Sequence, residues 1–188
     1  SFNSPTPRIF TAPNFLINGG LYTLPMVTEE SSVVAAAGNA AKFWSTRGGF
    51  KTKIKNTLKV GQIHFFFEGN LKELVAFFEH RKPDLLKATL SLTKNMQARG
   101  GGIMSLDLID KGDALMHYYQ LNVGFKTGDA MGANFINSCL EQLARSLIQF
   151  AKEDQLSEGY ENPIDIVMSI LSNYVPECLV SAQISCPL

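Results

Sequence analysis

The segment from Pro25 to Phe50, PMVTEESSVVAAAGNAAKFWSTRGGF, constrains the fold more than any other part of the sequence. Carboxylates and hydroxyls stand where a run of small apolar residues begins, a pattern typical of a buried helix with polar groups at its N-terminus. We predict a helix from Val33 to Trp44. Three residues are alternative N-caps, and the sequence does not choose among them: Thr28, Ser31 and Ser32.

The polar residues of this predicted helix fall on one narrow stripe formed by Asn39, Lys42 and Thr46. Most of the helix circumference should therefore be covered by other parts of the protein. Gly38 and five alanines give the helix little side-chain bulk. This composition indicates that another backbone packs closely against it.

Glu29 and Glu30 precede the helix and have two interpretations. Acidic residues near the first turn of a helix complement the positive end of its dipole. Alternatively, one glutamate beside a mostly apolar wall is kept protonated and acts as an acid. The residues alone leave both interpretations open.

Charge and composition exclude several classes of function. The 188 residues contain 17 basic and 17 acidic side chains, so no net field favours nucleic acid or an anionic membrane. No apolar run approaches the roughly 20 residues that span a bilayer, and the N-terminus lacks the pattern of a secretory signal. We therefore expect a cytoplasmic protein that binds neither nucleic acid nor membrane.

The cysteines and histidines do not form a metal-binding pattern. The three cysteines have unsuitable spacings, so we expect reduced thiols, and the three histidines are far apart and are interpreted as structural or solvent-facing. We predict no metal site. The residues concerned are Cys139, Cys178, Cys186, His64, His80 and His117.

Local patterns predict the remaining elements. Before the predicted helix there is a hairpin of Asn14–Ile17 and Leu21–Leu24 around Asn18-Gly19-Gly20, and after it a solvated basic strand or loop at Lys51–Lys59. The predicted helices that follow are Leu71–His80, capped by Asn70, a second from Pro83 to about Met96, and a third at Gly128–Asp154. The predicted strands are Gln62–Glu68, Ile103–Ile109, Ala114–Phe125, Ile164–Leu171 and Leu179–Ser185.

From residue 61 onward the predicted order is strand, helices, strand, strand, helix, strand. This order indicates an α+β fold of the ferredoxin-like, split βαβ kind, with helices on one face of a sheet. We therefore expect residues 61–188 to form one domain. Residues 1–60 fit no self-contained fold and are expected to belong to a different, larger domain.

A second suggestive motif lies at Gly128–Asn134, with the sequence GDAMGAN. Small residues at a helix N-terminus allow backbone amides to approach an anion such as a pyrophosphate, and Asp129 and Asn134 carry groups that bond sugar hydroxyls or an amide. The motif is not the G-x-G-x-x-G fingerprint of Rossmann folds. On its own it is equally consistent with a tight loop and an aspartate cap.

Taken together, the motifs resemble those of one family. NFLING, PMVTEESSVVAAAGNAAKF, RGGG at Arg99–Gly102, DAMGANFIN at Asp129–Asn137 and ILSN at Ile170–Asn173 occur in the order and near-spacing of the soluble, class II hydroxymethylglutaryl-CoA (HMG-CoA) reductases. The resemblance extends from about Asn14 to Leu188.

The resemblance implies a two-step reduction of HMG-CoA to mevalonate and CoA, or the reverse oxidation, with NAD(H) or NADP(H) as cofactor. It implies that Glu30 is a catalytic acid and that Ser32 contacts the HMG carboxylate. The implied cofactor-binding residues are Asp129, Met131, Gly132, Asn134, Asn173 and Asp84. The family also assembles its active site between subunits, so a homodimer or higher oligomer is expected, with residues 1–60 in the substrate-binding domain and 61–188 in the NAD(P)-binding domain.

Three departures from the family pattern qualify these expectations. The catalytic lysine, aspartate and histidine of the family lie downstream of Leu188, and its N-terminal ENVIG signature is missing from SFNSPTPRIF. We therefore expect a fragment that is inactive alone. A non-catalytic dinucleotide- or CoA-binding or oligomerisation module derived from the family is the alternative. Asp84 stands one residue after the position of the family's ribose-binding acid, and the adjacent Arg81 and Lys82 leave the choice between NADH and NADPH open.

Overall fold

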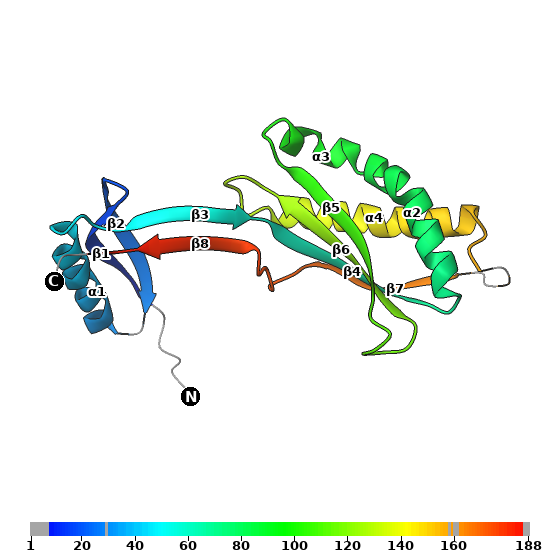
Figure 1. Ribbon diagram of the computed structural model, residues 1–188, viewed down its shortest axis with the longest axis horizontal. Coiled ribbons are helices and arrows are strands. Elements are labelled where there is room, and N and C mark those ends of the chain that lie inside the picture. Colours follow the sequence, from blue (N-terminus) through cyan, green and yellow to red (C-terminus); the bar gives the residue numbers. More distant parts are fainter. Residues whose placement is uncertain (1–7, 29, 158, 160–161, 186–188) are drawn as a thin grey trace. The chain divides into compact units, whose positions relative to one another are not determined.

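The computed structural model describes residues 8–28, 30–157, 159 and 162–185. The elements are β1 (Arg8–Ile17), β2 (Gly20–Thr28), α1 (Ser31–Ser45), β3 (Lys51–Thr57), β4 (Lys59–Phe67), α2 (Leu71–Ala88), α3 (Leu90–Gln97), β5 (Gly102–Asp110), β6 (Tyr118–Lys126), α4 (Ala133–Glu153), β7 (Ile164–Leu171) and β8 (Cys178–Gln183) (Figure 1). The chain divides into two compact units. Unit 1 contains the described residues up to Lys55 and from Leu179 onward, and unit 2 is Asn56–Cys178.

Unit 1 begins with the predicted hairpin, which is confirmed. β1 and β2 pair antiparallel, with Ile17 opposite Gly20. Asn18 and Gly19 have φ angles of 50° and 87°, the left-handed conformation that a two-residue hairpin turn of this kind needs. The Asn18 side chain also accepts a 2.9 Å hydrogen bond from the amide of Thr52, which anchors the turn to the start of β3.

α1 begins at Ser31, two residues before the predicted start, and none of the three expected caps serves as its N-cap. Glu30 occupies the N-cap position with extended backbone, and no side chain caps the helix. Instead, the Ser32 hydroxyl donates to the Glu30 carboxylate, and the Thr28 hydroxyl accepts a 3.3 Å hydrogen bond from the Glu30 amide. Two of the three predicted caps, Thr28 and Ser32, therefore bond to Glu30 rather than to the free amides of the first turn.

The expectation that α1 is covered on most sides is wrong for this chain. Its buried residues are only Val34, Gly38 and Ala41, because within unit 1 the helix packs mainly on β1. The close approach expected at Gly38 is confirmed, since a Cβ atom there would lie 3.2 Å from Cδ of Pro13. Phe43 is 48% exposed.

β3 pairs with β8, so the basic stretch is a largely exposed strand, as expected. Figure 1 shows β8 (red) beside β3 (cyan). This pairing places the last described strand in unit 1, whereas the sequence assigned it to the same domain as residues 61–171. The division between the two units falls inside β3, between Lys55 and Asn56, whereas the sequence predicts a domain boundary between residues 60 and 61.

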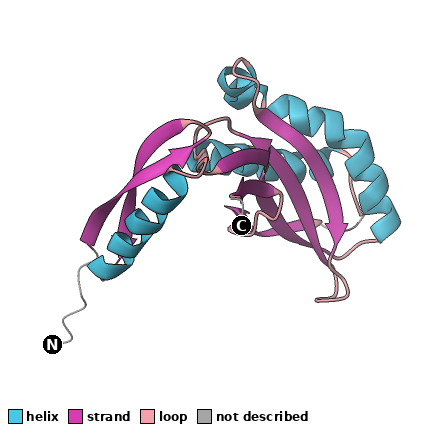
Figure 2. Ribbon diagram, turned by 60° about the vertical axis from the view of Figure 1, so that its left-hand side comes forward, coloured by secondary structure: helices cyan, strands magenta, loops and turns pink. Residues whose placement is uncertain are grey.

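Unit 2 is an α+β arrangement built on a four-stranded sheet of order β5-β6-β4-β7. All neighbouring strands are antiparallel. β4 alternates between buried Ile63, Phe65 and Phe67 and the half-exposed side chains between them. α2, α3 and α4 gather on one side of the sheet (Figure 2), and residues from α2 and α4 complete the core on the buried face.

Three predicted boundaries in unit 2 are wrong. α2 continues through Pro83 and ends at Ala88, because buried Leu85 extends its apolar face and the break occurs at Thr89 instead. The hydroxyl of Thr89, which is buried, donates to the carbonyl of Leu86 at 2.7 Å.

The other two boundaries involve turns longer than expected. β6 starts at Tyr118 rather than Ala114, since residues 111–117 form the connection from β5. α4 starts at Ala133, so the residues from Gly128 to Gly132 form a loop rather than a first turn. Among the described residues, no helix is long and apolar enough to cross a membrane.

Candidate functional site

A closed loop from Thr127 to Gly132 leads from β6 into α4. The Thr127 hydroxyl donates to the carbonyl of Ala130 at 2.7 Å. Gly132 is the N-cap of α4 and is left-handed, with φ of 79°, and a Cβ atom there would lie 2.5 Å from Cγ2 of Thr127. Asp129, Met131 and Asn134 are exposed around this loop, Met131 by 73%. The structure therefore brings together the predicted residues of the second motif.

Lys59, which the sequence reasoning did not select, holds this loop. Its ammonium group donates to the Thr127 hydroxyl at 2.8 Å and to the carbonyls of Ala130 and Met131 at 2.7 and 2.6 Å. Lys59 is the first residue of β4 and lies opposite Phe125, close to the end of β6. A separation of 68 to 72 residues between the partners left no local sequence signal for these contacts.

A shallow pocket of about 230 Å³ is lined by residues 131–135, where the loop enters α4. The first amides of any helix lack intrahelical partners, so the amides of Ala133, Asn134 and Phe135 are available to an anion at this place. Asn173 lies at the same end of the sheet, since the adjacent Ser172 amide donates to the carbonyl of Val60 at 2.8 Å.

Asp84 lies elsewhere in unit 2. It accepts a 3.2 Å hydrogen bond from Arg81, which also pairs with Asp154 just after the end of α4 and lies 3.6 Å from Glu153. Because α4 has 21 residues, its two ends are about 30 Å apart. Asp84 is therefore not brought to the loop.

Arg81 is largely engaged by these carboxylates. Its side chain is 18% exposed, and its guanidinium lies 4.8 Å from the ring centre of Phe150. The hydrogen bond from Arg81 lowers the pKa of the Asp154 carboxyl, in spite of some opposing desolvation. Lys82, the other cation considered for a phosphate contact, lies 3.8 Å from Asp107.

Glu30 and Ser32 lie together at the start of α1 in unit 1, and both are exposed. Their side chains are joined by the hydrogen bond from the Ser32 hydroxyl to the Glu30 carboxylate. Glu29 lies outside the described residues. The structure thus brings the predicted acid and the predicted substrate-binding hydroxyl into direct contact.

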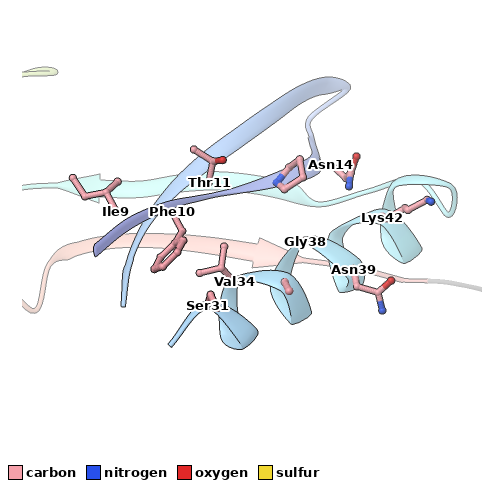
Figure 3. Close-up of a pocket in the computed structure, with 11 residues that line it drawn as sticks. Ile9, Phe10, Thr11, Asn14, Ser31, Val34, Gly38, Asn39 and Lys42 are labelled. Atoms are coloured by element: carbon pink, nitrogen blue, oxygen red, sulfur yellow. The ribbon is translucent and has the colours of Figure 1, made fainter. Parts of the chain in front are cut away.

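A groove of about 630 Å³ runs between β1 and α1 next to these residues. Figure 3 shows the Phe10 ring of the strand pointing toward Val34 of the helix, with Gly38 one turn further along the helix. The lining residues are Ile9, Phe10, Thr11, Pro13, Asn14, Ser31, Val34, Ala35, Gly38, Asn39 and Lys42. The small side chains of α1 therefore form one wall of a groove, as well as the packing face against β1.

No cluster of metal-ligating side chains occurs within the residues that the structure describes. The His64 ring is half-buried, its Nδ1 lies 2.7 Å from the Tyr118 hydroxyl, and burial followed by the charge of Lys111 lowers its pKa. Burial raises the pKa of the Cys139 thiol to about 11, which makes this cysteine unreactive. Cys186 lies outside the described residues.

Comparison with known proteins places this geometry in a family. A probable 3-hydroxy-3-methylglutaryl-coenzyme A reductase of Borreliella burgdorferi is 32% identical over 170 residues, which are 90% of this chain and 36% of that protein. The 3-hydroxy-3-methylglutaryl-coenzyme A reductase of Archaeoglobus fulgidus is 37% identical over 137 residues, 71% of this chain and 30% of that protein.

Among solved structures, the class II 3-hydroxy-3-methylglutaryl-CoA reductase from Streptococcus pneumoniae, bound to NADPH in open conformations, matches with a TM-score of 0.76. The two sequences are 31% identical, and the match covers 97% of this chain and 47% of that one. This chain thus spans about a third of the curated relatives and less than half of the solved structure. The family model for hydroxymethylglutaryl-coenzyme A reductase matches residues 9–188. The resemblance seen in the motifs is therefore confirmed, and this chain belongs to the hydroxymethylglutaryl-coenzyme A reductase family.

Proposed function

We propose that this chain supplies the dinucleotide-binding unit and part of the substrate site of an HMG-CoA reductase. The proposed reaction reduces HMG-CoA to mevalonate and CoA in two steps or runs in the reverse direction, and NADH or NADPH, when bound, supplies one hydride for each reductive step. The observation that carries this proposal is the geometry of the Thr127–Gly132 loop in a chain of this family. The family's catalytic lysine, aspartate and histidine are expected outside these residues.

The loop fits the phosphates of a dinucleotide. Gly132 exposes backbone where a side chain would collide with Thr127, and the pocket beside it is lined by the first residues of α4. Positive φ at Gly132 followed by helical residues turns successive amides toward one side, an arrangement that binds anions. We propose that the loop amides hold the pyrophosphate, and that Asp129, Asn134 and Asn173 bond the ribose or the nicotinamide amide.

Glu30 is proposed as the acid that stabilises the thioester oxygen. When a hydride adds to the carbonyl carbon, the oxygen gains negative charge, and a carboxylic acid nearby can donate a hydrogen bond or a proton to it. The contact with Ser32 supports a shared role. A serine has one hydroxyl hydrogen, so Ser32 must turn from Glu30 in order to donate to the HMG carboxylate.

Unit 2 is proposed as the cofactor domain of ferredoxin-like, split βαβ topology. The sheet order β5-β6-β4-β7, with helices after β4 and after β6, supports this assignment. Unit 1 is proposed as part of the substrate-binding domain. We further propose that the protein is at least a dimer, because the apolar side chains of Val33 and Phe43 on α1 are about half exposed in a single chain.

Asp84 is the ribose-binding acid expected from the resemblance, but it lies near the opposite end of α4 from the loop, about 30 Å away. The geometry therefore does not support its binding the ribose of a dinucleotide whose pyrophosphate is held by the loop. Arg81, which could meet the 2′-phosphate of NADPH, already has three carboxylate neighbours. The geometry therefore supports Lys82 over Arg81 as a phosphate contact if this helix takes part in binding.

The test is HMG-CoA-dependent oxidation of NADH and of NADPH by the full-length protein. We expect activity with at least one dinucleotide and its loss, by about 100-fold or more, in Glu30→Gln, which keeps the size of the side chain but cannot supply an acidic proton. Light scattering on the same samples checks that both proteins are folded dimers. Normal folding with dinucleotide binding but no oxidation would favour the non-catalytic module instead.

A further inference from the structure

We infer that Lys59 is a positioning residue for the dinucleotide, acting through the Thr127–Gly132 loop rather than by contact. This inference rests on the proposed function, because it concerns how the same loop is made ready for a pyrophosphate. Lys59 belongs to β4, whereas the motif that it organises follows β6.

The Lys59 ammonium group has as many acceptors around it as it has hydrogen-bond donors. An ammonium group has three N–H donors, and Lys59 has three acceptors, all between 2.6 and 2.8 Å: the Thr127 hydroxyl and the carbonyls of Ala130 and Met131. Thr127 is itself buried and donates onward to the carbonyl of Ala130. The loop is therefore closed around the end of a single side chain.

These contacts fix the direction of two peptide groups. In a trans peptide the carbonyl and the next residue's N–H point in opposite directions, and the described chain contains no cis peptide. Since the carbonyls of Ala130 and Met131 point at Lys59, the amides of Met131 and Gly132 point away from it. Met131 and Gly132 line the pocket at the start of α4, and neither amide donates a hydrogen bond within the described part of the chain.

The charge of Lys59 adds to this orientation. Its three acceptors are uncharged, and no described carboxylate forms an ion pair with it. The Lys59 charge therefore has no ion-pair partner among the described residues, and it lies beneath a loop whose backbone amides at Met131 and Gly132 point outward. Both features favour an anion on the outer side of the loop, which suits a pyrophosphate and not a neutral ligand.

The test compares Lys59→Met, Lys59→Arg and wild type for binding of NADH, NADPH and inorganic pyrophosphate by the full-length protein. Methionine keeps an unbranched side chain that is one atom shorter than that of lysine, and it removes the charge and the donors. We expect Lys59→Met to bind all three ligands roughly tenfold more weakly, the effect of one charge acting at a partly exposed site, and to show a smaller loss of affinity with added salt. Lys59→Arg should recover most of the affinity and the salt dependence.

The matched control is Lys72→Met, which makes the same change in net charge on the exposed first turn of α2, after the opposite end of β4. It should bind like wild type. Equal affinity and equal salt dependence in Lys59→Met and wild type would overturn the inference, whereas a wild type that binds neither dinucleotide would overturn the proposed function instead. If Lys59→Met does not fold, Lys59→Gln carries the same test, because it removes the charge and keeps an amide donor.

Discussion

Position 132 requires glycine for two reasons, its left-handed backbone conformation and the nearby side chain of Thr127. Its φ of 79° is unfavourable for any residue with a Cβ atom, and that atom would lie 2.5 Å from Cγ2 of Thr127. We predict that Gly132→Ala destabilises the protein by about 2–4 kcal/mol, since the left-handed conformation alone costs about 1–2 kcal/mol and the collision adds to it. Urea unfolding gives this free energy directly.

Gly100 provides a matched control for that prediction. Its φ is 77°, almost the same as at Gly132, but nothing lies within 4 Å of a Cβ atom placed there. Gly100→Ala should therefore show only the backbone cost of about 1–2 kcal/mol. Equal destabilisation by the two substitutions would show that the contact with Thr127 has no energetic effect, contrary to our account of the loop.

At the scale of elements, the sequence identified those features whose signals are local. The Asn18-Gly19 turn needs only two residues of suitable conformation, and the Asn70 cap accepts its 2.8 Å hydrogen bond from Lys72 close by. The small residues of the DAMGAN motif likewise marked the loop before α4. Lys59 could not be found in this way, because its role depends on the pairing of β4 with β6.

The wrong predictions about helices and strands likewise concern features that depend on contacts between distant parts of the chain. Pro83 reads as a helix start when only its neighbours are considered, yet the buried face of α2 continues to Leu85 and keeps the helix intact. The pairing of β8 with β3 and the exposure of α1 are also tertiary properties, since they depend on which surfaces are available to each element. The structural preference of a short segment does not decide its conformation where burial of apolar surface in the whole unit favours another one.

Pro83 should therefore destabilise α2, although the helix still forms because its apolar side chains are buried. It is exposed inside the helix, lacks the N–H that would bond to the carbonyl of Glu79, and crowds that carbonyl. We predict that Pro83→Ala stabilises the protein by roughly 1–2 kcal/mol, less than the full cost of an interior proline because the unfolded chain also gains freedom. Thermal and urea unfolding measure the change.

Lys87→Ala is the control for Pro83→Ala, because it changes an exposed side chain of the same helix without altering any backbone hydrogen bond. It should change stability by no more than about 0.5 kcal/mol. A loss of stability in Pro83→Ala would contradict the prediction and would mean that the ring makes a favourable contribution to α2.

At the scale of the whole molecule, the two units differ in how much apolar surface they bury. The large hydrophobic cluster, from Ile63 to Ile164, lies entirely within unit 2. Among the described residues of unit 1, the buried hydrophobic side chains are only Ala12, Val34 and Ala41. Because burial of apolar area is the main source of stability, unit 2 should be the stable part of this chain and unit 1 should open more readily.

Hydrogen exchange of the 188-residue chain tests this difference between the units. We expect the amides of β4, β6 and α4 to exchange only through global unfolding, and those of α1 and of the β1–β2 hairpin to exchange at least about 100-fold faster, a difference of roughly 2.7 kcal/mol in opening free energy. Adding a dinucleotide should slow exchange in α4 and leave α1 unchanged, if the ligand binds unit 2. Protection of α1 equal to that of β4 and β6 would contradict the prediction, because the described residues of unit 1 bury too little apolar surface to provide it.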